Sequence, residues 1–96
     1  MGLTRRAFIS QEGSTPEAVR YVLESPRRRA LHQDVRGRLI LNRPMNTGAY
    51  SLTEEGVSRG IHVLDCRVEI GAGRASFTAP FAAVDASEWD VPADER

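Results

Sequence analysis

The sequence predicts an α+β fold, in which a small, mainly antiparallel sheet carries one or two helices packed on one face. Residues 61–81 contain two runs of alternating apolar and polar side chains around a glycine-bearing turn, which is typical of a β-hairpin. Residues 15–24 combine helix-start signals with an apolar stripe. The chain has 96 residues, which is enough for one domain with a modest core.

The hairpin gives the clearest fold signal. Its apolar positions are Leu64, Cys66, Val68 and Ile70 in the first run, and Ala75, Phe77, Ala79 and Phe81 in the second. A four-residue loop at 71–74 pairs Val68 with Phe77 and keeps all eight residues on one face, which we expect to be buried. Because Pro80 has no N–H to donate, the second strand is predicted to be an edge strand or to stop pairing there. An exposed strand at residues 75–81 would allow homo-oligomers to form by edge pairing.

Residues 5–10 are predicted to form a short strand, and residues 15–24 a helix. Thr15 supplies a capping hydroxyl, Pro16 suits the first turn, and Glu17 places a negative charge near the helix N-terminus. The apolar stripe of this helix consists of Ala18, Val19, Val22 and Leu23.

The middle of the chain has two interpretations. Residues 26–35 form either a second helix, capped by Ser25, or an extended arginine-bearing segment. Residues 38–42 are predicted to form a strand, and residues 49–52 its return strand, across a turn rich in helix- and strand-breaking residues.

Composition excludes several chemistries. All thirteen basic residues are arginine, so the chain has no P-loop lysine, no Schiff-base lysine and no Ser-x-x-Lys pair. GC-rich coding explains this bias, which would fit an accessory protein of a bacterium or phage. The formal net charge is zero.

The reactive side chains are few. If His62 and Cys66 lie on one strand, they are about 13 Å apart and cannot form a catalytic dyad. His32 could approach Cys66 in space, but the histidines and Cys66 show none of the short ligand spacings of zinc modules. We therefore predict no catalytic residues, no metal site, no cofactor and no enzyme activity.

The sequence also bears on location. It contains no apolar run near eighteen residues, so no membrane span is predicted. Residues 4–9 resemble a twin-arginine export signal, but polar residues follow where such signals need an apolar segment. A single cysteine suits a reducing compartment. These observations predict a cytoplasmic protein.

A basic cluster is the main candidate binding site for an anionic partner. It comprises Arg27, Arg28, Arg29, Arg36, Arg38 and Arg43. Arginine binds phosphates and carboxylates bidentately. The alternative is a solvated surface partly paired with the acidic second half of the chain.

Residues 50–56 read Tyr-Ser-Leu-Thr-Glu-Glu-Gly and follow an Arg-Leu-Ile-Leu strand and a turn. This stretch resembles the Tyr-x-Leu-Thr-x-x-Gly ending of the wing in winged helix–turn–helix regulators. The resemblance implies DNA binding in the major groove by an arginine-rich helix at residues 26–35, with backbone contacts from the wing. The chain departs from that family because residues 5–10 are predicted as strand and the hairpin at 61–81 has no counterpart in the minimal fold.

Residues 1–84 are predicted to form the domain, and residues 85–96 an acidic C-terminal tail. Trp89 lies within that tail and either anchors a protein partner, with Phe81 on the hairpin, or packs on the chain's own sheet. The sequence favours a small non-catalytic binding or adaptor module that acts by protein–protein contacts. The alternatives are a nucleic-acid-binding protein and a structural subunit of a larger assembly.

Overall fold

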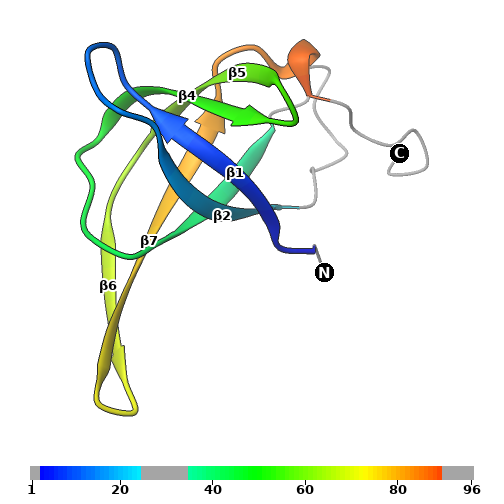
Figure 1. Cartoon of the computed structure of the whole chain (residues 1–96). Coiled ribbons are helices and arrows are strands. Elements are labelled where there is room, and N and C mark those ends of the chain that lie inside the picture. The colour runs from blue at the N-terminus through cyan, green and yellow to red at the C-terminus, as the bar shows by residue number, and fades with distance from the viewer. Residues whose placement is uncertain (1–2, 25–34, 90–96) are drawn as a thin grey trace.

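The computed structural model describes residues 3–24 and 35–89, and these residues form an almost entirely β structure (Figure 1). The strands are β1 (Arg5–Ser10), β2 (Glu17–Leu23), β3 (Arg36–Leu41), β4 (Gly48–Glu54), β5 (Val57–Val63), β6 (Arg67–Gly71) and β7 (Arg74–Ala83). The described helical content is one 3-10 turn, η1 (Ala86–Glu88). The prediction of an α+β fold is therefore wrong.

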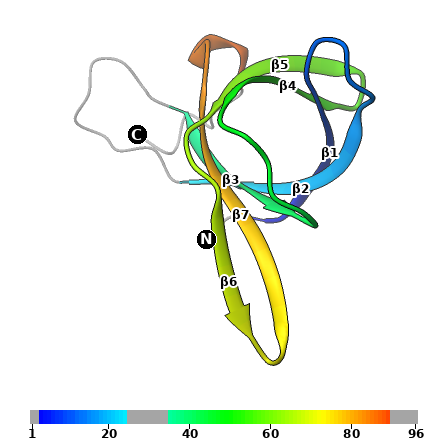
Figure 2. The same cartoon turned by 90° about the vertical axis from the view of Figure 1, so that its left-hand side faces the viewer.

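Six of these strands close into an antiparallel barrel. The strand order is β3-β2-β1-β4-β5-β7-β6, and β3 also pairs with β7, which joins the two ends of the sheet. Figure 2 shows the resulting ring, with β6 and the first part of β7 projecting away from it. A closed barrel has no edges, so the projecting hairpin holds the terminal strand of the described sheet, β6.

The core is filled by inward-pointing side chains at alternate positions of the barrel strands, as the pleat requires, and β6 contributes none of them. Its largest fully buried members are Tyr21, Phe81, Leu39, Leu52, Ile61 and Val63. Gly37 on β3 packs most closely, since a Cβ added there would lie 2.5 Å from the carbonyl oxygen of Val22 and 2.6 Å from Cζ of Phe81. The barrel wall therefore has room for glycine alone at this point.

Residues 17–23, predicted as part of a helix, form β2 instead. Val19 and Tyr21 point into the barrel, whereas Ala18 and Arg20 are exposed on its outer face. The segment is rich in β-branched and aromatic residues, and it pairs with β1 on one side and β3 on the other. The helix predicted for residues 26–35 lies largely outside the described residues, and Val35 at its end is buried beside β3.

The register predicted for the hairpin is confirmed near the turn, since Val68 pairs with Phe77 and Ile70 with Ala75. It is wrong farther from the turn, where Phe81 pairs with Val63 and not with Leu64. Gly71 pairs with Arg74, so the loop itself is a two-residue turn. The same predicted strand is broken at residues 64–66, where it leaves the barrel at the end of β5 and resumes as β6.

The prediction of an edge strand at residues 75–81 is wrong for residues 77–81, because there β7 pairs with β3 on one side and is flanked by β5 and β6 on the other. Residues 75 and 76 pair with β6 and with no other described strand. Pro80 is tolerated there for a local reason. Its carbonyl accepts a hydrogen bond from the N–H of Leu64 at 2.9 Å, so its ring nitrogen faces the break between β5 and β6. A missing donor at that break disrupts no ladder bond.

The motif that resembles a wing lies on β4 and on the turn into β5. Glu55 and Gly56 form this turn with φ angles of 52° and 80°. Within residues 3–24 and 35–89, no helix has the length and apolar character needed to cross a membrane.

Candidate functional site

The arginines selected from the sequence do not form one site in the described structure. Arg27, Arg28 and Arg29 lie outside the described residues. Arg36 and Arg38 lie on the outward face of β3. Arg43 follows β3 and forms an ion pair with Glu17 at 2.6 Å, a contact that raises the pKa of its guanidinium.

The aromatic residues selected as protein contacts lie inside the molecule. Phe81 is fully buried and Trp89 is 6% exposed. Both pack against Tyr21, with ring centroids 6.1 Å apart in each case. Trp89 thus packs on the chain's own sheet, and neither ring is presented to a partner in this conformation.

A charged cluster lies against two of these rings, Tyr21 and Trp89. Glu54 accepts a hydrogen bond from the Tyr21 hydroxyl at 2.6 Å, and pairs with Arg5 at 3.1 Å and Arg59 at 3.7 Å. The Arg59 guanidinium also lies over the Trp89 ring, 4.9 Å from its centroid. Burial and the bond to Glu54 raise the pKa of the Tyr21 hydroxyl above its usual value of about 10, so it stays protonated further into alkaline pH. The Tyr21, Arg5 and Arg59 side chains all contact Glu54, which suits a structural role, whereas the buried Trp89 Nε1 has no hydrogen-bond partner among the described residues.

The structure describes Cys66 but not His32, the histidine considered as its partner, which lies outside the described residues. Cys66 is partly buried in the link between β5 and β6, where its N–H donates to the Asp65 side chain at 2.8 Å. In the part of the chain that the structure describes, no three His, Cys, Asp or Glu side chains are grouped closely enough to hold a metal ion.

The projecting hairpin is the first surface with features of a binding site, and we call residues 67–77 the arm. This hairpin projects away from the barrel (Figures 1 and 2). All of β6 is exposed, including Val68 at 56% and Ile70 at 81%. Val68 and Ile70 share one face with their partners Phe77 and Ala75. The prediction of burial on this face is therefore wrong for β6, because no described element covers it.

The arm also presents unpaired backbone groups. Its turn residues, Ala72 and Gly73, have φ angles of 52° and 74°, and a two-residue turn of this kind makes Gly71 and Arg74 a hydrogen-bonded pair. Ladder bonds alternate along a strand, so the N–H and C=O groups of Val68 and Ile70 point away from β7. Within the described residues, no strand pairs with that side of β6.

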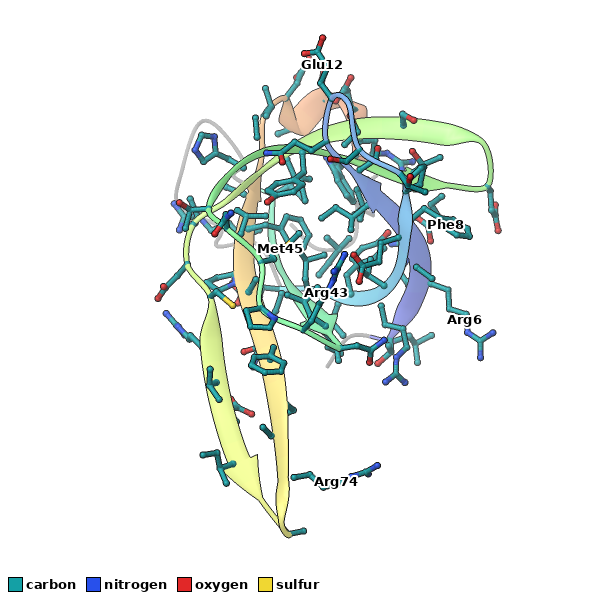
Figure 3. All side chains as sticks on the ribbon, turned by 60° about the vertical axis from the view of Figure 1, so that its left-hand side comes forward. Arg6, Phe8, Glu12, Arg43, Met45 and Arg74 are labelled. Atoms are coloured by element: carbon teal, nitrogen blue, oxygen red, sulfur yellow. The ribbon has the colours of Figure 1, made fainter. Side chains whose placement is uncertain are left out.

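A second surface lies on the outer face of β1, β2 and β3, and we call it the arginine face. Arg6 is directly opposite Arg20, and Arg38 lies diagonally beyond Arg20 across the next pair of strands. These three side chains form no ion pair with any other described residue. A groove of about 540 Å³ runs past Arg6 and Arg20. Figure 3 shows Arg6 and the half-exposed Phe8 pointing outward from β1.

Sequence reasoning missed Arg6 and Arg20, because their proximity depends on the pairing of β1 with β2. Alternation along each strand could have indicated their orientation. Arg6 is next to the core residue Ala7, and Arg20 is next to the core residue Val19, so both arginines face outward. Comparison of the chain with protein-family models, with curated proteins and with solved structures found no match.

Proposed function

We propose that this protein is a non-catalytic binding module that acts by protein–protein contacts, and that its arm is the contact element. One observation carries the proposal: the arm presents an exposed apolar pair, Val68 and Ile70, on a strand whose outer backbone groups pair with no other described strand. Proteins bind such edges by adding a strand, in which the main chain supplies affinity and the side chains supply specificity.

The contrast with the rest of the sheet supports this assignment. Natural proteins protect the edges of their sheets, and the barrel does so by closing through β3 and β7. The arm leaves that closed structure and ends in a two-residue turn, with Arg74 at its tip (Figure 3). An arm of this kind suits a subunit of a larger assembly. We also propose a cytoplasmic location, supported by the single cysteine.

Crosslinking in the source cells, read out by mass spectrometry, tests the proposal. Ile70→Asp places a charge on the apolar face of the arm, and Leu3→Asp makes the same change at an equally exposed position away from it. We expect Ile70→Asp to lose most crosslinks to other polypeptides, while Leu3→Asp keeps them. Equal crosslinking by both variants would exclude the arm as the contact element.

A second candidate function, binding of nucleic acid or another polyanion, is favoured by the arginine face. Like charges directly opposite each other destabilise a strand pair, as Arg6 and Arg20 do here unless an anion lies between them. Arginine forks bind phosphate oxygens bidentately, and the exposed Phe8 ring offers a flat surface beside them.

Fluorescence anisotropy with a labelled DNA duplex tests this second candidate. The combined variant Arg6→Ala, Arg20→Ala, Arg38→Ala should weaken binding and flatten its dependence on salt. The matched control removes three arginines from elsewhere on the chain: Arg43, Arg67 and Arg74. If both triple variants bind alike, the arginine face is not the site. The triple variant Arg27→Ala, Arg28→Ala, Arg29→Ala tests the basic segment outside the described residues in the same assay.

A further inference from the structure

We propose that the partner of the arm is a second copy of this chain, bound through β6 in antiparallel register about a two-fold axis at Val68. In this arrangement Arg67 of each copy lies opposite Glu69 of the other. The inference rests on the proposed function, because it identifies the protein that the arm contacts.

Backbone geometry limits the registers available. The outward N–H and C=O groups of β6 belong to Val68 and Ile70, as the two-residue turn requires. Two β6 edges form hydrogen bonds only where outward groups meet outward groups. Every register that sets Val68 against Arg67 or Glu69 of the other copy is therefore excluded.

Charge then selects among the remaining registers. An axis at Glu69 would place the two Glu69 carboxylates opposite each other, and an axis at Arg67 would do the same with two guanidinium groups. An axis at Ile70 would leave only the tip of the strand paired. The axis at Val68 instead places Glu69 of each copy beside Arg67 of the other on the polar face, and cross-strand pairs of opposite charge stabilise a sheet. The Arg67 guanidinium also lies 3.5 Å from its own Asp65, and its exposed side chain has further donors for Glu69.

The same register matches the apolar side chains. Residues directly opposite each other in an antiparallel pair lie on the same face of the sheet. The two Val68 side chains therefore meet at the axis, and Ile70 lies against Cys66 of the other copy. The Cys66 N–H stays bonded to its own Asp65 side chain, so the backbone bonds of the contact centre on the two Val68 residues. The result is one four-stranded sheet in the order β7-β6-β6-β7, with a barrel at each end. The contact is isologous and closes on itself, so it forms a dimer and does not propagate.

Analytical ultracentrifugation of the full chain over a range of concentrations provides the test. Because five residues per copy make a small contact, we expect a weak monomer–dimer equilibrium. Arg67→Glu sets Glu against Glu69, and Glu69→Arg sets Arg against Arg67. Each single variant should raise the dissociation constant about tenfold or more, since two attractive pairs become repulsive. Both sites are exposed, so circular dichroism should show unchanged folding.

The double variant Arg67→Glu, Glu69→Arg restores opposite charges in this register and should dimerise like the natural chain. An equimolar mixture of the two single variants should form a heterodimer for the same reason. A natural chain that remains monomeric up to about 1 mM, or a double variant that fails to recover dimerisation, would overturn the inference. If the chain stays monomeric while Ile70→Asp still loses its crosslinks in cells, the self-pairing fails and the protein-binding function stands.

Discussion

The barrel and the arm are built from the same kind of strand, but water reaches them very differently. Ile61 on β5 is fully buried, whereas Ile70 on β6, nine residues later, is 81% exposed. Both residues lie in antiparallel pairs with β7. Alternating apolar residues on a strand therefore show which residues share one face of the sheet. Whether that face is buried depends on whether another part of the protein packs against it. The barrel supplies its own opposite wall, and the arm has none among the described residues.

Truncation of the two isoleucines should reveal this difference most strongly. We expect Ile61→Ala to lower the free energy of unfolding by about 2–5 kcal/mol, because it leaves a cavity in the core. Ile70→Ala should change it by less than about 0.5 kcal/mol. Urea unfolding followed by Trp89 fluorescence measures both. Similar losses in the two variants would mean that the arm is packed in solution.

Added methyl groups on the backbone should have the next largest effect. Gly37→Ala forces a Cβ against the Val22 carbonyl and the Phe81 ring, and we expect a loss of about 1–3 kcal/mol. Gly71→Ala meets no atom within 4 Å on the arm, so the unfolding free energy should be unchanged or slightly higher. Thermal unfolding of the two variants compares them directly. A destabilised Gly71→Ala variant would contradict an open arm.

The hydrogen bond between Tyr21 and Glu54 should make a smaller contribution to stability. Tyr21→Phe removes the hydrogen bond to Glu54 but keeps the buried ring, and we expect a loss of about 1–2 kcal/mol. Tyr50→Phe is the matched control, since the Tyr50 hydroxyl donates to the backbone carbonyl of Asn46 in a more exposed setting. Its loss should be smaller by at least half. Equal losses would mean that the Glu54 cluster contributes little.

The pH dependence gives the smallest effect. The pKa of the Tyr21 hydroxyl is higher in the folded protein than the value of about 10 expected in the unfolded chain, because of burial and the bond to Glu54. Its contribution to stability is therefore complete below pH 10 and is lost as the pH rises further. In urea unfolding, Tyr21→Phe should lose less stability than the natural chain between about pH 10 and pH 11. If the stability of the two proteins falls equally over this pH range, the loss does not come from the Tyr21 hydroxyl.

The sequence predicted the register near the turn of the hairpin because alternation and turn glycines act locally. Val68 pairs with Phe77 whether or not anything covers them. The same reasoning failed for residues 17–23, where the four residues assigned to a helical stripe are divided between the two faces of β2. The period-two pair Val19 and Tyr21 was the better signal, but the residues Thr15 and Pro16 also suit the loop that they occupy.

The candidate surfaces were less accessible to prediction. The arm depends on the break at residues 64–66, where the alternation of the strand shifts by one residue. Before the break Val63 shares a face with Phe81, and after it Val68 shares a face with Phe77. The arginine face depends on the pairing of β1, β2 and β3, which brings Arg6 and Arg38 together from distant parts of the sequence. Neither long-range pairing has a local pattern that specifies it.

The strand β7 has a mechanical consequence. It runs without interruption from the tip of the arm, at Arg74, to Ala83 in the barrel wall. A pull on the tip along the strand is therefore transmitted directly to the seam between β7 and β3. The ladder bonds of that seam lie across the direction of the pull, so they share the force and break together in shear. Tension applied through the arm thus meets the barrel where its hydrogen bonds resist jointly.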